Sequence, residues 1–242
     1  MERRAYEAMA EIEGSHWWFV GRRAILEALI KHRIRPDRSS RILEAGCGTG
    51  GNLALLRQFG TVEAFEFDAQ AREIASRKSC IDVQAGSLPD GIEHLSGPYQ
   101  LIALFDVLEH LDRDEDSLRS LRRLLAKDGK LILTVPALQF LWSQHDVLHH
   151  HRRRYSGRRL QDVLERAELQ VNYMSYFNSL LLPAAVVQRL ASRFGKSEVS
   201  LDGVPPKIAN TILGRIFAVE RRILRHARLP IGLSLCAICS AR

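Results

Sequence analysis

The residues of this chain best suited to chemistry form a glycine-rich loop. Four glycines occupy the six positions from residue 46 to residue 51, directly after a short apolar stretch. Glycine is needed where the backbone takes a positive φ or must lie against a ligand. Gly46, Gly48 and Gly51 fit the G-x-G-x-x-G dinucleotide fingerprint, whereas Gly46, Gly48 and Gly50 fit a G-x-G-x-G nucleoside loop. The loop therefore predicts a nucleotide-like ligand of one of two kinds.

Two glutamates beside this loop favour the nucleoside interpretation. Glu44 lies two residues before the first glycine, where a carboxylate would accept a hydrogen bond from an ammonium group but repel a pyrophosphate. Glu66 ends the next apolar run, 16 residues after Gly50, where a carboxylate can bind both ribose hydroxyls. In the alternative interpretation, the segment is a structural glycine turn flanked by two solvated glutamates and binds no ligand.

A second group of candidates follows the apolar run 99–105. Asp106 and His110 are four residues apart and would face one pocket if the segment were helical. His110 is a candidate general base near neutral pH. In the competing interpretation, His110 only packs or caps within a polar loop.

The third group is a segment rich in histidine and arginine, from Trp142 to Arg159. A metal site would use His145, Asp146 and one of His149–His151, but consecutive histidines cannot all point to one centre, so no metal is predicted. A solvated basic face is the plain alternative. The interpretation we adopt is an anion- or substrate-binding loop in which arginines bind the acceptor and a histidine transfers a proton. It makes His110 and His145 the catalytic candidates, with substrate contacts from Trp18, Asp146, His151, Arg153, Tyr155 and Asn178.

The elements that would position these residues alternate between strand and helix, which is typical of a parallel sheet with crossover helices. The predicted strands are 41–45, 62–67, 81–84, 99–105, 130–135, 169–176 and 233–239. The predicted helices between them are 51–58, 69–78, 114–126 and 157–167. In such a sheet, ligands bind beyond the carboxyl ends of the strands, and Gly86, Ser87 and Leu88 would lie there within reach of an adenine edge.

Two further regions decorate this core. Helices 2–13 and 16–33 precede the first strand, with a His16–Phe19 aromatic cluster between them that packs on the sheet or covers the ligand mouth. Helices 179–194 and 207–226 form an insert that covers the active site or lies on a membrane surface. The predicted organisation is an N-terminal helical cap over 1–40 and one catalytic domain over 41–242, with the insert at 179–226.

Taken together, Glu44-Ala-Gly-Cys-Gly-Thr-Gly, Glu66, Phe105-Asp-Val-Leu-Glu-His-Leu111 and Asp128-Gly-Lys-Leu-Ile-Leu-Thr-Val-Pro136 resemble the class I S-adenosylmethionine-dependent methyltransferases of the small-molecule type. The whole arrangement also resembles a poorly characterised bacterial subgroup of them. The resemblance implies a Rossmann-like, doubly wound, seven-stranded α/β sheet with strand seven antiparallel. It also implies that Glu44 and the glycines hold the methionine part, Glu66 the ribose, residues 86–88 the adenine, and Asp106 and Val107 the pocket wall. The expected cofactor contacts are Glu44, Gly46, Cys47, Gly48, Gly50, Asn52, Glu66, Phe67, Gly86, Ser87, Leu88, Asp106 and Val107. Gly86-Ser87 replaces the aspartate that such enzymes often place beside the adenine.

Composition limits the partners of the chain. A net charge of +7 favours an anionic partner such as a phosphorylated substrate, a nucleic acid or a membrane surface. The four cysteines form no metal pattern and are expected to be buried free thiols, consistent with the cytoplasm. The N-terminus lacks the apolar core of a signal peptide, and no apolar run is long enough to span a membrane. Either a monomer or a homodimer fits these features.

The sequence thus predicts an enzyme that uses S-adenosylmethionine, with S-adenosylhomocysteine as product, to methylate oxygen or carbon of a small acceptor. A sugar-, polyketide- or lipid-linked biosynthetic intermediate is the expected acceptor class. An RNA methyltransferase is an alternative supported by charge, although no base-flipping motif or RNA-binding module is present. An NAD(P)-dependent oxidoreductase and a non-catalytic cofactor-binding module are the remaining alternatives.

Overall fold

The computed structural model describes residues 3–193 and 204–242. Among them, seven strands form one sheet in the order β3-β2-β1-β4-β5-β7-β6. The strands are β1 (Arg41–Ala45), β2 (Thr61–Glu66), β3 (Gln84–Ala85), β4 (Tyr99–Phe105), β5 (Leu125–Pro136), β6 (Leu169–Phe177) and β7 (Ser234–Ala241). β3, β2, β1, β4 and β5 are parallel, whereas β7 is antiparallel to both β5 and β6. The predicted Rossmann-like fold is therefore confirmed.

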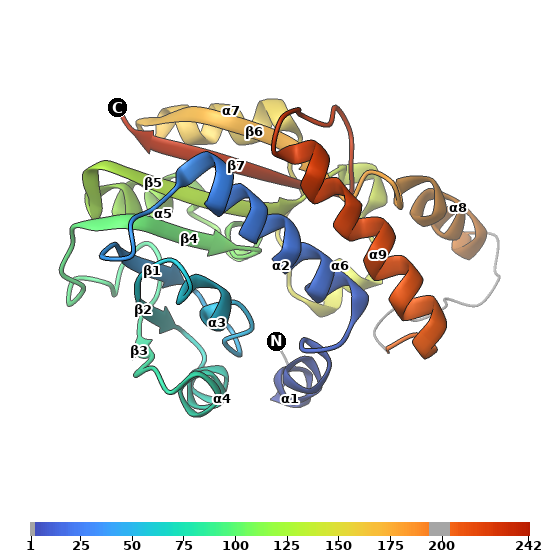
Figure 1. Cartoon of the computed structure of the whole chain (residues 1–242), viewed down its shortest axis with the longest axis horizontal. Helices are drawn as coiled ribbons and strands as arrows, with labels where there is room; N and C mark the ends of the chain where they lie inside the picture. The colour runs from blue at the N-terminus through green and yellow to red at the C-terminus, as the bar shows by residue number, and fades with distance from the viewer. Residues whose placement is uncertain (1–2, 194–203) are drawn as a thin grey trace.

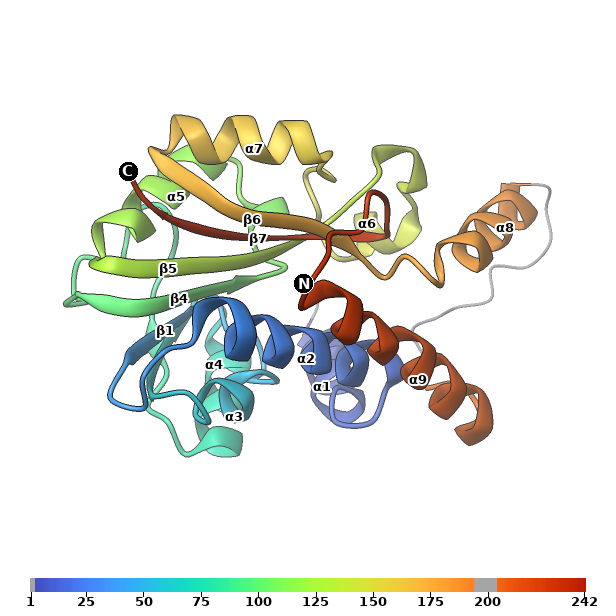
Figure 2. The ribbon, with the colours of Figure 1, turned by 45° about the horizontal axis from the view of Figure 1, so that its top comes forward.

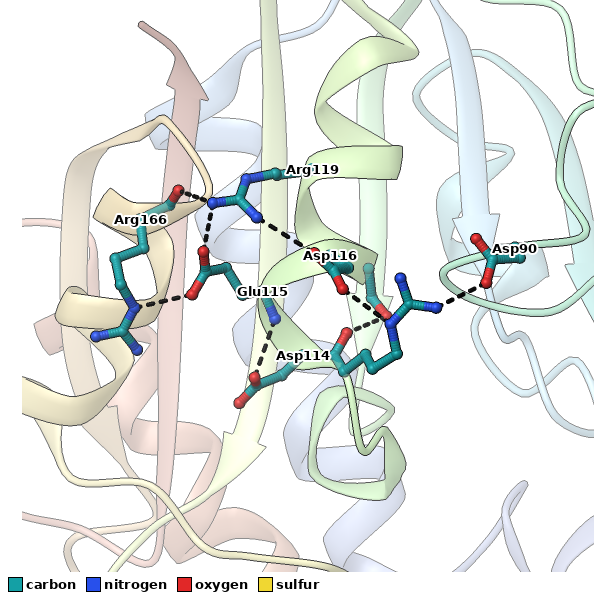
Figure 3. A network of polar contacts seen from close by, with 8 residues as sticks. Asp90, Asp114, Glu115, Asp116, Arg119 and Arg166 are labelled. Atoms are coloured by element: carbon teal, nitrogen blue, oxygen red, sulfur yellow. Dashed lines mark hydrogen bonds and ion pairs between the residues drawn. The ribbon is translucent and has the colours of Figure 1, made fainter.

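Helices cover both faces of this sheet (Figures 1 and 2). Around one face lie α2 (Trp17–Leu29), α3 (Leu53–Leu56), α4 (Ala69–Ser79) and α9 (Lys207–Leu224). The other face is covered by α5 (Asp114–Arg123) and α7 (Gly157–Arg166). Buried aliphatic side chains on each face form a separate cluster, so every central strand is apolar on both sides. On the outer surface of the second layer, Arg166 of α7 donates to Glu115 of α5 at 2.9 Å, within a network of ion pairs (Figure 3).

The remaining helices are α1 (Arg3–Ile12), α6 (Gln144–Leu148) and α8 (Leu182–Arg193), with a π-helical turn over Ile30–Ile34 and 3-10 turns over Leu108–His110 and Gln139–Leu141. α8 and α9 lie between β6 and β7 in the chain, as predicted for the insert, although residues 194–203 of that insert lie outside the described residues. Both views place α6, α8 and α9 on the side toward which β4 points (Figures 1 and 2). None of the described helices is long and apolar enough to cross a bilayer.

Several predicted boundaries are wrong for identifiable reasons. Strand β5 begins at Leu125 rather than residue 130, because Leu125 pairs with Tyr99 before a register shift. Helix α5 accordingly ends at Arg123. Strand β3 is reduced to Gln84 and Ala85, which pair with Phe65 and Glu66. The short helix α6 was not predicted, and Cys80 is exposed, unlike the other three free cysteines.

Candidate functional site

The glycine loop joins β1 to α3 and has the backbone that its sequence predicts. Gly46, Gly48 and Gly50 all have positive φ, between 54° and 81°. A Cβ at Gly46 would lie 3.0 Å from the Val107 side chain, so this position has no room for a larger residue. The Gly46 and Cys47 amides donate to the Phe65 carbonyl at 3.0 and 3.1 Å, which ties the loop to the end of β2.

Glu66 holds this loop against the start of α4. Its two carboxylate oxygens accept hydrogen bonds from the Gly48 amide at 2.8 Å and the Asp68 amide at 2.9 Å. Each oxygen keeps a further lone pair that a ligand hydroxyl can use. The next side chain, Phe67, is 78% exposed and offers an aromatic face beside this carboxylate. Tyr6 of α1 lies near enough that burial, and then the charges of Glu66 and Asp68, raise its pKa to about 12.

A buried polar chain extends from the loop to the end of β4. Asn52 donates to Glu44 at 2.9 Å, Arg22 of α2 donates to Asn52 at 3.4 Å, and Arg22 also forms an ion pair with Asp106. Asp106 is held just beyond β4 with φ of 54°, and the Arg22 guanidinium lies 4.7 Å from the centre of the Trp18 ring. Helix α2 thus contributes a cation to a buried polar group that contains the Glu44 and Asp106 carboxyl groups.

Among the hydrogen-bonded residues Glu44, Asn52, Arg22 and Asp106, two buried atoms have no hydrogen-bond partner among the described residues. They are Glu44 Oε2 and Arg22 Nε. Burial raises the pKa of Glu44 to about 8 and lowers that of Arg22 to about 10. Leaving a buried polar atom unpaired costs about 1–3 kcal/mol, so such atoms point to an absent partner. One is an acceptor and the other a donor, which are the two kinds of group needed to bind an α-amino acid.

The loop after β3 lies beside the end of β2 that carries Glu66. The Gly86 amide contacts the Glu66 carbonyl at 3.4 Å, and a Cβ at Gly86 would lie 2.9 Å from the Phe65 ring. Ser87 donates to the Asp90 carbonyl at 2.5 Å, so its hydroxyl is used within the turn. Leu88 is half-buried. These residues lie where the sequence predicts, beside the second acidic strand end.

A second polar cluster is centred on Asp146 of α6, which is fully buried. Its oxygens accept from His151 Nδ1 at 2.9 Å, from Arg154 Nε and Nη2 at 2.8 and 2.9 Å, and from the Ser143 amide at 2.9 Å. Burial alone would raise the pKa of Asp146, but the hydrogen bonds from His151 and Arg154 outweigh it and hold this pKa well below its ordinary value. Asp146 is therefore a fixed anion that orients the His151 ring.

His110 lies directly against His151, with ring centres 4.7 Å apart. Burial, and then the nearby charges of His151 and His149, lower the pKa of His110 to about 4, so its ring is neutral at physiological pH. Glu109 is almost completely buried; burial raises its pKa to about 8, and neither carboxylate oxygen has a hydrogen-bond partner among the described residues. Ligand atoms of Glu109, His110 and His151 all lie within 4.8 Å of one another.

Glu109 connects the two clusters electrostatically. The charges of both Arg22 and Arg154 act on its carboxyl group, the first from the Glu44–Asn52 cluster and the second from the Asp146 cluster. The Glu109 carbonyl also accepts from the Arg152 amide at 2.8 Å, which fixes the basic segment against the end of β4. The two clusters are therefore neighbouring parts of one polar region.

Other predicted substrate residues have different surroundings. Arg153 and Tyr155 both donate to Asp114 at the start of α5, at 2.8 and 2.9 Å. Asn178 is buried at the end of β6, with φ of 57°, and its carbonyl accepts from Leu233. The His145 side chain lies outside the described residues. The structure thus brings together His110, His151 and Asp146, and separately Glu44, Asn52, Arg22 and Asp106, while Arg153 and Tyr155 contact Asp114 of α5.

A cavity of about 430 Å³ lies beside the glycine loop, between α2 and α3. Its lining includes Glu13, Arg23, Glu27, Gly51 and Lys78. None of the residues that form the two polar clusters lines it. The candidate site is therefore formed by the buried polar groups and is separate from this cavity.

Sequence reasoning missed three residues of the region: Arg22, Glu109 and Arg154. Arg22 has a recognisable signal, since it follows Trp18 by one helical turn and would share its face. Glu109 lies inside the predicted site segment 106–111, but the sequence of a polar loop does not show that one of its acids is completely buried. Arg154 is one of three consecutive arginines, and only the fold shows that this one binds Asp146.

Comparison with known proteins agrees with this geometry. Residues 20–173 match the family model described as a methyltransferase domain. A malonyl-[acyl-carrier protein] O-methyltransferase from Enterobacter lignolyticus is 28% identical over 152 residues, which are 59% of this chain and 61% of that protein. The chain therefore spans less than two thirds of the length of that relative.

Solved structures share the fold at low sequence identity. An S-adenosylmethionine-dependent methyltransferase from Archaeoglobus fulgidus matches with a TM-score of 0.58 and 13% identity, over 90% of this chain and 93% of that one. A geranyl diphosphate C-methyltransferase from Streptomyces coelicolor, solved with Mg²⁺, geranyl diphosphate and S-adenosylhomocysteine, matches with a TM-score of 0.56 and 15% identity, over 88% and 77%.

Proposed function

The chain belongs to the methyltransferase-domain family, and from this premise we propose that it transfers the methyl group of S-adenosylmethionine to a small-molecule acceptor. The observation that carries the proposal is the pair of unpartnered buried atoms at the glycine loop, Glu44 Oε2 and Arg22 Nε. S-adenosylmethionine supplies an activated methyl group on a positively charged sulfur and carries both an ammonium and a carboxylate group. The pocket therefore matches this cofactor in charge at both ends of its amino-acid part.

Each part of the cofactor has a candidate partner in the described chain. Glu44 and Asp106 would accept from the ammonium group, and Arg22 Nε would donate to the carboxylate. Glu66 would accept from the ribose hydroxyls with its remaining lone pairs, and the exposed Phe67 ring would cover an adenine face. Positive φ at Gly46, Gly48 and Gly50 lets the backbone approach the ligand closely.

For proton removal we propose His151 as the general base, oriented by Asp146. The Asp146 carboxylate accepts from Nδ1 of the ring at 2.9 Å, which fixes the orientation of the imidazole and would stabilise its protonated form. The acceptor proton would move to His151 as the new oxygen–methyl or carbon–methyl bond forms and the sulfur–methyl bond breaks. His110, neutral and in ring contact with His151, would help to orient the acceptor.

A divalent cation is a second way to activate the acceptor, favoured by one observation. The buried Glu109 carboxylate has no hydrogen-bond partner among the described residues and lies beside His110 and His151. A carboxylate and two imidazoles are suitable ligands for Zn²⁺ or Fe²⁺. Dialysis against a chelator separates the two mechanisms, because the His151 base predicts unchanged activity, whereas a bound cation predicts loss of activity and recovery on adding metal.

An anionic or carrier-linked acceptor fits the charge of the basic segment best. The net charge is +7, and Arg152, which pairs with the exposed Asp112 at 3.3 Å, is more than half exposed beside the proposed base. The relatives named above methylate a malonyl-carrier protein and geranyl diphosphate, which are both acidic. We therefore favour O- or C-methylation of an acidic, sugar-, polyketide- or lipid-linked intermediate.

The test has two stages. Isothermal titration should show binding of S-adenosylmethionine and S-adenosylhomocysteine; binding of NADH in their place would contradict the proposal. Methyl-labelled cofactor should then be incubated with separate lipid, carrier-protein, small-molecule and RNA fractions. Label in the RNA fraction would support the nucleic-acid alternative, and cofactor binding without transfer to any fraction would support a non-catalytic binding module.

A further inference from the structure

The outward face of α9 carries a row of exposed aliphatic side chains. Ile208 is 77% exposed, Ile212 52% and Val219 45%, and Ile216 continues the same row. They recur at spacings of three and four residues, so they lie along one side of the helix. The opposite side is buried, with Phe217 packed at the centre of the contact with α2. The row is thus additional to the apolar surface that α9 uses for folding.

The exposed charges on the same helix are all of one sign. Lys207, Arg215, Arg221 and Arg222 are exposed, and none of them forms an ion pair with the described residues. The sole acid between residues 204 and 242 is Glu220, which is fully buried and accepts from the Ser179 and Leu180 amides at 2.7 and 2.8 Å. Glu220 therefore serves the fold and does not neutralise this surface.

A comparison within the molecule shows that helix α5 lacks this pattern. Helix α5 is also rich in arginine, but there Arg119 pairs with Glu115 and Asp116, and Arg113 pairs with Asp116 and Asp90 (Figure 3). Charges on that surface are balanced and the exposed face is polar. On α9, unpaired cations flank aliphatic side chains, which is the composition of a helix that lies on an anionic membrane.

We propose that the outward face of α9 docks on the surface of an anionic phospholipid membrane. Aliphatic side chains would enter the region below the headgroups, while the lysine and arginine side chains contact lipid phosphates. A second copy of the chain fits less well, because two such faces would repel each other. RNA also fits less well, because this face offers no aromatic ring for base stacking.

The position of α9 would connect membrane docking to the proposed cofactor pocket. Its inner face packs on α2, where the Trp17 amide donates to Asn210 at 2.8 Å. The same α2 carries Trp18 and Arg22 to the cofactor pocket. Docking would hold the pocket near the bilayer surface, where a lipid-linked acceptor is available. This use rests on the proposed function, whereas the membrane contact itself does not.

Sedimentation with vesicles tests the proposal on the full chain. Vesicles of about three parts phosphatidylcholine to one part phosphatidylglycerol should bind at least about tenfold more tightly than phosphatidylcholine alone, and binding should weaken as salt rises. Ile212→Asn and Arg215→Glu should each reduce this binding by about tenfold. Arg123→Glu, an exposed charge change on α5, should leave it unchanged.

The affinity for S-adenosylmethionine, measured on every variant, reports folding and tests the proposed function separately. Equal binding to neutral vesicles, or equal losses in Arg123→Glu and Arg215→Glu, would overturn the proposal. So would binding to RNA but not to vesicles, or concentration-dependent self-association that Ile212→Asn abolishes.

Discussion

Arg22 is the residue on which the proposed cofactor pocket depends most. It contacts Asp106 and Asn52, is influenced by Glu44 and Glu109, and retains one buried N–H without a partner among the described residues. A hydrogen bond from a charged donor contributes about 1.5–3 kcal/mol, or about 10- to 100-fold in affinity. Arg22→Gln should therefore raise the Kd of S-adenosylmethionine by that factor in isothermal titration. Arg23→Gln is the matched control, since Arg23 is half-buried and faces the separate cavity; equal effects of the two changes would refute this role.

Glu44 gives the cofactor affinity a predictable dependence on pH. Its pKa is raised to about 8 because it is buried, so the free protein holds this proton at pH 7. A ligand ammonium favours the ionised carboxylate, and binding must release the proton. The affinity should therefore increase from pH 6 to about pH 8 and then level off. Titration in buffers of different ionisation enthalpy should detect the released proton, and it should be absent in Glu44→Gln and retained in Glu63→Gln.

His151 and Asp146 can be tested by separating catalysis from cofactor binding. If His151 removes the acceptor proton, His151→Ala should lower kcat by about 100-fold or more while the Kd of the cofactor changes less than about twofold. Asp146→Asn should produce a smaller loss of kcat with the same split, because it acts through the ring it orients. His149→Ala is the control, since its ring centre is 6.0 Å from that of His151. A comparable loss in the control would assign the effect to packing.

At the scale of elements, the contact between α2 and α9 links the pocket to the insert. A Cβ at Gly21 would lie 2.4 Å from the Phe217 ring, and both residues are buried. Gly21→Ala should destabilise the chain by about 1–2 kcal/mol, because overpacking outweighs the gain in helix propensity. Chemical denaturation measures this change. Gly14→Ala has open space around the added methyl and should have little effect. A larger loss of unfolding free energy in Gly14→Ala than in Gly21→Ala would show that α9 shifts without cost.

The elements also show which parts of the fold the sequence could predict. The strands β1, β2 and β4 are mostly buried and read as apolar runs, so they were predicted within one residue of their bounds. The start of β5 depends on a register shift opposite Tyr99, and β3 on pairing with the end of β2. Such pairings are properties of neighbouring strands and leave no pattern in their own residues.

In the whole molecule, the glycine-loop part of the site could be predicted from the sequence, whereas the geometry of the Asp146 cluster could not. The glycine loop, Glu44 and Glu66 are local to consecutive strand ends, so parallel topology alone brings them together. The Asp146 cluster joins α6, the basic segment and the end of β4, and its geometry depends on a short helix that has no clear periodicity. Which of several adjacent histidines and arginines points inward is decided by packing. His151 was among the predicted substrate contacts, whereas Arg154 could not be separated from Arg152 and Arg153 beforehand.

The whole molecule also provides a test that distinguishes the two interpretations of the glycine loop. A ligand that binds only the folded chain at about 100 times its Kd stabilises it by about 2.7 kcal/mol, or about 5–10 °C in Tm for a chain of this size. S-adenosylmethionine and S-adenosylhomocysteine should both produce this shift, because Glu66, the glycine loop and the buried Glu44–Arg22 chain come from several elements that must all be folded. NADH should not, since it has no ammonium group in that part of the molecule to pair with Glu44, and the Asp106 carboxylate would oppose its pyrophosphate. A shift with NADH alone would reverse the assignment, and Arg22→Gln should reduce the shift with S-adenosylmethionine at the same ligand concentration.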